Sequence, residues 1–199
     1  MGPGAGPTQH PGDGLRTSGV DDAELARLAR EGDSDAFGQL VERYALAARR
    51  VARAVLRDDD EADDAVQDGV LAAWRAIERY DPARPFRPWM MRIVVNAALD
   101  LRRRDKVRRT EMIPETVESR TIGPDRATDS VILGAQLRAA LAELPERQRV
   151  AVVLFDAEGY SHAEIAAMLE VPEGTVRSYV FHGRRALRRV LGPIKEELR

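Results

Sequence analysis

The chain has 199 residues, with 31 lysines and arginines against 33 aspartates and glutamates and a formal net charge of −2. It contains no cysteine, which excludes disulfides, thiolate metal sites and a cysteine nucleophile. Aromatic residues make up only 5% of the chain, and alanine, leucine, valine and arginine dominate, which favours helices over sheets. No run of about 18 apolar residues occurs, so no stable membrane insertion is expected.

The first half of the chain is predicted to be one helical domain. Residues 1–20 are rich in glycine and proline and are expected to form a disordered tail. After this tail, apolar residues recur at the spacing of three and four that marks one face of a helix. This spacing predicts a short helix that begins at Asp21 or Asp22, followed by helices over about 34–56, 61–79 and 87–104. The four helices would form a domain over residues 21–104.

A second helical domain is predicted after a linker. Residues 105–129 carry mixed charges and several helix breakers, which is typical of a connection between domains. Helical periodicity returns over 130–199, where Ser161 and Glu164 have the spacing of a capping box and Thr175 is a candidate cap for a last helix that runs to about 191. Two short helices joined by a tight turn predict a helix-turn-helix. The predicted fold class is therefore all-α, with two small helical domains joined by a flexible linker.

Charges of the two signs are concentrated in different segments. Residues 57–67 hold six acidic residues and one base, whereas residues 84–109 hold nine basic residues and two acids. Residues 177–195 hold six basic residues and no acid. This sorting indicates two contacts with a polyanion and one contact with a basic partner.

The last helix is the strongest candidate for a DNA contact. Its apolar side would be buried, and its other faces carry side chains that suit guanine edges, phosphates and thymine methyl groups in a major groove. The residues on these faces are Arg177, Ser178, Phe181, His182, Arg184, Arg185 and Arg188. The alternative interpretation is a solvated basic helix whose charges suit the C-terminal end of the helix dipole.

The fourth helix carries a second candidate site. Arg92, Asn96 and Arg103 fall within a narrow arc at about 100° per residue, just after a loop that is flanked by Tyr80 and Phe86. An asparagine flanked by arginines is suited to hold a base of single-stranded DNA. Alternatively, Asn96 is a surface amide and the arginines lie over the core.

The acidic segment Asp58 to Asp64 has three interpretations. The carboxylates can stabilise the N-terminus of the third helix, or they form, with Gln67 and Asp68, a docking surface for a basic partner. A metal site is disfavoured because consecutive acids on a helix point in different directions and no histidine lies nearby.

The sequence also lacks a phosphate-binding glycine loop, GxSxG and HExxH, so neither enzymatic activity nor a cofactor is expected.

Three stretches carry a resemblance to a known family. They are DAFGQLVERY (35–44), EADDAVQDGVLAAWRAIERYDPARPFRPWMMRIVVNAALDLRRR (61–104) and LAELPERQRVAVVLFDAEGYSHAEIAAMLEVPEGTVRSYVFHGRRALRR (141–189). They resemble domains 2 and 4 of the bacterial extracytoplasmic-function (ECF, group 4) sigma factors of RNA polymerase. The resemblance implies a cytoplasmic protein that binds core polymerase, recognises −35 and −10 promoter elements and promotes promoter opening for a stress or envelope-type regulon.

The resemblance also implies partners and residue roles. The partners would be core RNA polymerase, through its β′ clamp helices and β flap, promoter DNA and an anti-sigma factor. In domain 2, the polymerase contacts would be Asp64, Gln67 and Asp68, and the −10 contacts would be Tyr80, Arg84, Phe86, Arg92, Asn96 and Arg103. In domain 4, the −35 contacts would be Arg149, Thr175, Arg177, Ser178, Tyr179, Phe181, His182 and Arg185.

The chain departs from the family pattern at several of these positions. Tyr179 and His182 stand where arginine is common, and the loop sequence Pro-Ala-Arg-Pro (82–85) is particular to this chain. Neither promoter element can therefore be copied from a relative. The alternative function is a helix-turn-helix regulator that binds duplex DNA without polymerase, which leaves the acidic helix and Asn96 unexplained.

Overall fold

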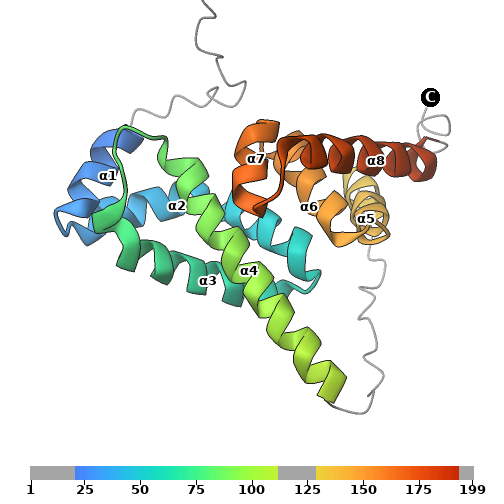
Figure 1. The fold of residues 1–199 in the computed structure, drawn as a ribbon, viewed down its shortest axis with the longest axis horizontal. Coiled ribbons are helices and arrows are strands. Elements are labelled where there is room, and N and C mark those ends of the chain that lie inside the picture. The colour runs from blue at the N-terminus through green and yellow to red at the C-terminus, as the bar shows by residue number, and fades with distance from the viewer. Residues whose placement is uncertain (1–20, 112–128, 193–199) are drawn as a thin grey trace, which may run out of the picture.

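The computed structural model describes residues 21–111 and 129–192, and every regular element in these two ranges is a helix (Figure 1). The first half holds α1 (Asp22–Arg30), α2 (Ser34–Leu56), α3 (Asp59–Ala76), the 3-10 turn η1 (Ile77–Arg79) and α4 (Phe86–Glu111). The second half holds α5 (Asp129–Ala142), α6 (Glu146–Val152), the π-helical turn η2 (Val153–Ala157), α7 (His162–Leu169) and α8 (Glu173–Leu191). The predicted all-α fold is confirmed. The predicted tail and most of the predicted linker lie outside the described residues.

Side-chain caps explain where several helices begin. The first backbone N–H groups of a helix have no partner within the helix, and a carboxylate or hydroxyl oxygen can accept from them. Asp33 does so at the start of α2, and Asp58 accepts from the N–H groups of Asp60 and Glu61, each at 2.9 Å, at the start of α3. Ser161 and Glu164 form the predicted capping box at the start of α7. Asp58 therefore contributes to capping.

Three helix boundaries differ from the sequence-based prediction. The third helix begins at Asp59, two residues before the predicted start, because Asp58 caps it. The fourth helix continues to Glu111 instead of ending at 104, because the segment after 104 consists largely of good helix formers and contains no proline or glycine. The last helix begins at Glu173 behind Pro172, so Thr175 lies in its first turn and is not its cap.

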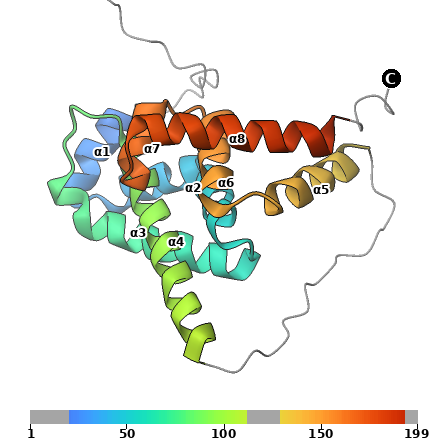
Figure 2. The same ribbon diagram turned by 45° about the vertical axis from the view of Figure 1, so that its right-hand side comes forward.

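The first half is built around α2, α3 and α4, and α1 packs across one end (Figure 1). Helices α3 and α4 approach closely at Gly69, where an added Cβ would lie 3.1 Å from the Cα of Val94. Small residues allow such a close approach of two helix axes, and alanines fill much of the neighbouring core. The C-terminal turns of α4 project away from the rest of the molecule (Figures 1 and 2).

An aromatic cluster closes the α1 end of this half. The ring centroids of Phe37 and Trp74 are 5.0 Å apart, and the ring of Tyr80 lies 5.5 Å from Phe86 and 4.9 Å from Trp89. Tyr80 and Phe86 are only 3% and 2% exposed. Both rings therefore belong to the hydrophobic core.

The second half packs α8 across α6 and α7, with α5 beside α8 (Figure 2). At Gly183 of α8 an added Cβ would lie 2.5 Å from Cγ2 of Val152, so α8 and α6 touch where only glycine fits. The left-handed conformation of Gly159, with φ of +74°, turns the chain between η2 and α7. The predicted helix-turn-helix is therefore held against a third helix.

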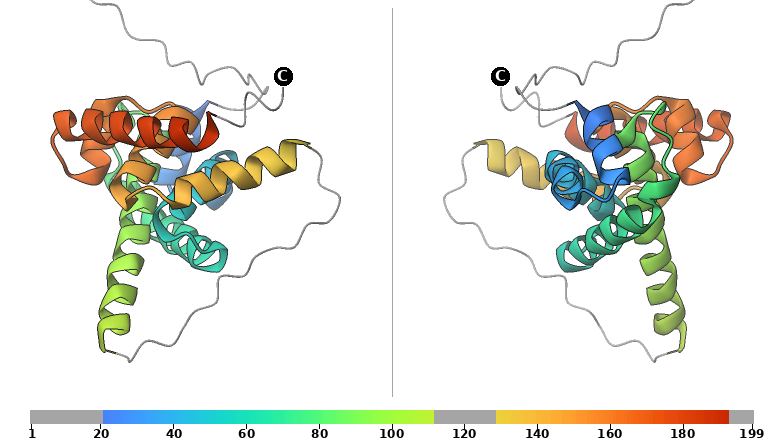
Figure 3. Two further views of the ribbon diagram at one scale, coloured as in Figure 1. Left: turned by 90° about the vertical axis from the view of Figure 1, so that its right-hand side faces the viewer. Right: turned by 90° about the vertical axis from the view of Figure 1, so that its left-hand side faces the viewer.

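The two halves pack against each other. Helix α6 contacts α2, and α7 contacts α4 (Figures 1 and 3). One continuous hydrophobic cluster includes Val51 and Val95 from the first half and Val150, Leu154 and Ile165 from the second. We call this packing the closed arrangement. None of the helices in the two described ranges is long and apolar enough to cross a membrane.

Candidate nucleic-acid interface

Helix α8 presents a basic and polar face to solvent. Val176, Val180 and Gly183 are buried against the other helices of the second half. On the outer face, Arg177, Ser178, Phe181, His182 and Arg185 are exposed, and Thr175 and Tyr179 are half-buried. Phe181 is 62% exposed, which is unusual for a large apolar ring and suits contact with an apolar group of a ligand. This face therefore has the composition of a surface that reads a DNA major groove.

Carboxylates hold two arginines of α8. Glu173 accepts from Arg177 at 2.7 Å, one turn away on the same helix. Asp156 pairs with Arg184, whose guanidinium also lies 4.9 Å from the centre of the Phe155 ring. The hydrogen bond to Asp156 raises the pKa of Arg184. Arg184 is thereby ordered by the second half itself.

Arg149 does not share this surface. It is 3% exposed and donates to the main-chain carbonyls of Ala54, Val55 and Leu144. Burial lowers the pKa of Arg149 to about 10. Arg149 therefore joins α6 to the end of α2, and the −35 contact expected for it is not available in the closed arrangement.

Helix α4 carries the second set of predicted DNA contacts. Arg92 and Arg103 are exposed, and Asn96 is half-buried between them along the helix. Arg103 pairs with Asp100 at 2.7 Å. Arg92 pairs at 3.5 Å with Glu170, which comes from the end of α7 in the second half. The predicted arc of Arg92, Asn96 and Arg103 is thus present on α4, but the second half of the chain lies beside it.

The loop before α4 is positioned by its own hydrogen bonds. The Tyr80 hydroxyl donates to the carbonyl of Arg84, and the Asp81 carboxylate accepts from the N–H of Ala83 at 3.0 Å. The Arg84 side chain is 81% exposed and is available to a ligand. The rings of Tyr80 and Phe86, however, are buried in the core, so the −10 contact expected for them is not available in the closed arrangement. Burial also raises the pKa of Tyr80.

Helix α3 exposes the predicted acidic surface. Asp64, Gln67 and Asp68 are all exposed, and their spacing places them on one face. Leu71, which is 51% exposed, continues this face by one turn and was not identified from the sequence. An exposed leucine next to acidic residues suits a partner that offers both basic and apolar groups.

Two further acids of this segment pair with arginines of the first half. Asp59 pairs with Arg53 at 2.5 Å and Asp63 pairs with Arg49 at 2.8 Å, so the two carboxylates tie α3 to α2. In the ranges that the structure describes, no group of three or more histidine, cysteine, aspartate or glutamate side chains is arranged to hold a metal ion. Structural pairing therefore accounts for part of the acidic run.

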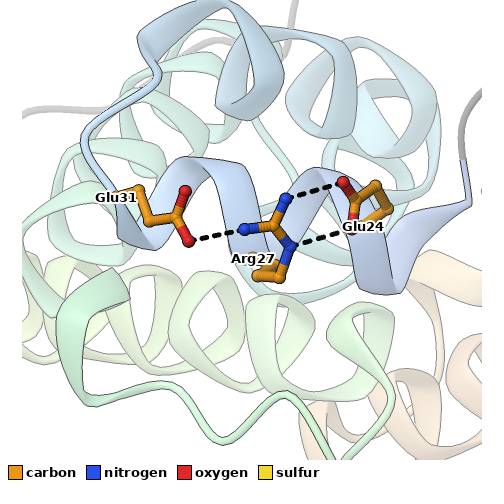
Figure 4. Close-up of polar contacts among 3 residues, drawn as sticks. All are labelled: Glu24, Arg27 and Glu31. Carbon is orange, nitrogen blue, oxygen red and sulfur yellow. Dashed lines mark hydrogen bonds and ion pairs between the residues drawn. The ribbon is translucent and has the colours of Figure 1, made fainter.

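Helix α1 carries an ion-pair ladder on its outer face. Arg27 donates to Glu24 on one side and to Glu31 on the other, over a span of two turns (Figure 4). The hydrogen bond from Arg27 lowers the pKa of Glu24. These charges balance one another on the helix surface, so α1 lacks the one-signed charge of a nucleic-acid contact.

A polar cluster between the halves was missed by sequence reasoning. The Glu158 carboxylate accepts from Arg50 of α2 at 2.7 Å and from Arg87 of α4 at 3.0 Å. The guanidinium of Arg87 lies 4.7 Å from the centre of the Tyr160 ring. Glu158 lies 108 positions after Arg50 and 71 positions after Arg87 along the chain, so no local sequence pattern connects it to either arginine.

The fold and the surfaces define a class of protein. Two helical units, one with an exposed recognition helix and one with a basic helix beside an acidic helix, are typical of a DNA-binding protein that also docks on another protein. Family models agree with the two units. The model described as Sigma-70 region 2 matches residues 40–108, and the model described as Sigma-70, region 4 matches residues 134–187.

Known relatives narrow the class further. The chain is 42% identical over 173 residues to the ECF RNA polymerase sigma factor SigM of Mycobacterium tuberculosis, which covers 86% of this chain and 85% of SigM. It resembles the structure of CnrH in complex with the cytosolic domain of CnrY, with a TM-score of 0.64, 31% identity and coverage of 86% and 97% of the two chains. It also resembles the sigma factor RpoE of Bartonella quintana in complex with the anti-sigma factor NepR, with a TM-score of 0.68, 26% identity and coverage of 78% and 96%.

The chain belongs to the ECF sigma factors of RNA polymerase. It acts in promoter-specific initiation of transcription. Family membership thereby decides between the two functions that the sequence left open, because a helix-turn-helix regulator that works without polymerase is a different class of protein.

Proposed function

We propose that three surfaces divide the work of initiation: α8 contacts the −35 element, α4 contacts the −10 element, and α3 docks on core RNA polymerase. The observation that carries the proposal is the exposure of the polar face of α8 on a firmly packed helix-turn-helix. A recognition helix must be rigid on its buried side and accessible on the other, and α8 meets both requirements.

On α8, Arg177, Ser178 and Phe181 form the centre of the −35 contact. Arg177 suits a guanine edge or a phosphate, and Phe181 suits a thymine methyl group. Thr175, Tyr179, His182 and Arg185 surround them. Arg149 has no part in this contact while it is buried.

On α4, Arg92 and Asn96 are the proposed −10 contacts, with Arg84 and Arg103 as phosphate contacts on either side. Asn96 has an amide that can pair with the edge of an unpaired base, and the arginines supply charge and a stacking plane. Tyr80 and Phe86 support this site from the core by fixing the loop and the start of α4.

On α3, the exposed face with Asp64, Gln67, Asp68 and Leu71 is the proposed contact with the β′ clamp helices. The second domain would contact the β flap. The protein itself carries out no catalytic step in this proposal, because polymerase supplies the chemistry. It would act in the cytoplasm, where polymerase and the chromosome are.

An anti-sigma factor is a further proposed partner. The RpoE structure contains the anti-sigma factor NepR, and the likeness of this chain to RpoE extends over most of its length. By this analogy an anti-sigma factor would hold the protein inactive until a stress or envelope-type signal releases it.

Binding to core polymerase tests the proposed docking surface. Asp68→Arg reverses one charge on the exposed face of α3, and we expect at least about tenfold weaker core binding by fluorescence anisotropy, since like charges across an interface cost several kcal/mol. Asp60→Arg, which changes an exposed acid near the capped end of the same helix, is the matched control. Equal binding of both variants and the unmodified protein would contradict the assignment.

Mapping transcript 5′ ends after overexpression then identifies the promoter elements.

A further inference from the structure

The contact between the two halves contains a buried carboxylate that binds two arginines of the first half. The Glu158 side chain is 1% exposed, whereas Arg50 and Arg87 are 47% and 30% exposed. Arg87 also donates to the main-chain carbonyl of Glu158 at 2.8 Å. A buried carboxylate is tolerated only when it is paired and hydrogen-bonded. Both of its charged partners come from the opposite half, so separating the halves would remove them together.

A second contact caps a helix across the same boundary. Helix α2 ends at Leu56, and its last carbonyls have no donors within the helix. Arg149 of α6 supplies donors to the carbonyls of Ala54 and Val55. The closed arrangement therefore satisfies groups of the first half with side chains of the second.

The same arrangement brings carboxylates to the basic side of α4. Glu170 lies 3.5 Å from Arg92, and Glu146 lies 3.4 Å from Arg102. Both carboxylates come from the second half and both arginines from the helix proposed to contact the −10 element. These carboxylates occupy the arginines that DNA phosphates would otherwise engage.

We propose that the contacts around Glu158 and Arg149 form a latch that keeps the free protein closed, and that this latch opens when the protein engages polymerase and a promoter. The requirement for opening rests on the proposed function, because two separate promoter elements need α4 and α8 on separate stretches of DNA. The latch itself does not depend on that function.

The chemistry of the latch suits reversible opening. Buried ion pairs recover little net free energy after desolvation, yet they disfavour arrangements that leave either partner unpaired. Contacts between domains that include many polar groups are commonly broken and remade. A latch of this composition favours one closed geometry, and it can open when a polyanion or a partner binds the arginines in place of Glu158.

The chain offers a matched pair of variants to test the latch. Arg50 and Arg49 are neighbours on α2 with side chains 47% and 48% exposed. Arg50 reaches Glu158 in the other half, whereas Arg49 reaches Asp63 within its own half. Arg50→Ala therefore removes a latch contact, and Arg49→Ala removes a comparable pair that plays no part in it. Glu158→Gln is the second latch variant, because it removes the charge at nearly constant volume.

Single-molecule energy transfer measures the opening directly. The chain has no cysteine, so Leu46→Cys on α2, one turn from Arg50, and Ala163→Cys on α7, five residues from Glu158, provide two exposed labelling sites on either side of the boundary. We expect the free protein to show mainly a high-transfer population. Arg50→Ala should raise the ratio of open to closed molecules at least about fivefold, and Glu158→Gln by more, while Arg49→Ala leaves the ratio unchanged.

Each outcome decides the proposal. The latch would be overturned if Arg50→Ala and Glu158→Gln gave the same distribution of transfer efficiencies as Arg49→Ala. It would also be overturned if the unmodified free protein were already open. Far-UV circular dichroism identifies a variant that is unfolded, and in that event Arg50→Ala alone decides.

Core polymerase with promoter DNA should convert the unmodified protein to low transfer. Retention of high transfer in that complex would overturn the requirement for opening, whereas failure to bind core would contradict the proposed function and leave the free-protein result standing.

Discussion

Helices α8 and α4 carry similar side chains but differ in accessibility. The outer face of α8 holds Arg177, Ser178 and Phe181 in solvent. On α4, by contrast, Arg92 and Arg102 lie beside carboxylates of the other half. Arg177 also pairs with a carboxylate, but its partner Glu173 lies on the same helix. In the closed arrangement the proposed −35 contact is therefore exposed, whereas two arginines of the proposed −10 helix are paired across the boundary between the halves. One contact between the halves can thereby restrain one proposed DNA-binding surface and leave the other exposed.

We expect the largest effect on the contact between the two halves from a substitution of Arg149. Arg149→Ala removes the donor to three main-chain carbonyls and leaves a cavity between α6 and α2, so the free energy of unfolding should fall by about 3 kcal/mol. Arg147→Ala is the control, because Arg147 is half-buried and its side chain donates one hydrogen bond within the part of the chain that the structure describes, 3.4 Å to the carbonyl of Leu169. Urea unfolding measures both variants. An equal loss in the two would show that Arg149 has no special role in joining the halves.

The rigidity of the α8 side depends on Gly183. A methyl group there would lie 2.5 Å from Cγ2 of Val152, so Gly183→Ala should destabilise the second half by about 2 kcal/mol. Gly174→Ala on the same helix meets no atom within 4 Å and should be neutral or slightly stabilising. Thermal unfolding followed by circular dichroism compares them. Equal melting temperatures would contradict the close packing of α8 on α6.

Substitutions in the two proposed DNA contacts should impair different steps of initiation. Arg177→Ala should weaken binding to duplex −35 DNA by about 1–3 kcal/mol if the side chain pairs with a base. Asn96→Ala should leave core binding and −35 binding intact and impair promoter opening, measured by permanganate reactivity of unpaired thymines. Normal opening with Asn96→Ala would show that this face of α4 does not read the −10 element.

The smallest expected effect concerns Tyr160, which lies between the halves. Its hydroxyl is buried and has no hydrogen-bond partner among residues 21–111 and 129–192, so Tyr160→Phe should be neutral or stabilising by up to about 1 kcal/mol. Burial raises the pKa of Tyr160 above its ordinary value of 10.0. Ionisation is thus easier in the unfolded chain, and this tyrosine's contribution to stability is full below pH 10 and declines as the pH rises above it. Tyr160→Phe should reduce the loss of stability between pH 9 and pH ~11, and an unchanged loss would assign it to other groups.

The sequence by itself determined the helices and the α8 surface. Apolar spacing of three and four residues, together with the Ser161–Glu164 box, depends on neighbours within a turn or two of the chain. A helix-turn-helix is equally local, so its exposed residues can be read from periodicity. The acidic face of α3 could be predicted for the same reason, although the exposed Leu71 beside it was overlooked.

Only the tertiary structure decided which polar and aromatic residues lie inside. Tyr80 and Phe86 flank a proline-rich loop and suggested accessible rings, but they pack with Trp89 across the turn. Arg149 and Glu158 have the composition of surface residues, yet each is buried by partners from the other half. Local periodicity carries no information on such pairings, because the groups that satisfy a buried charge are brought together by the packing of distant helices.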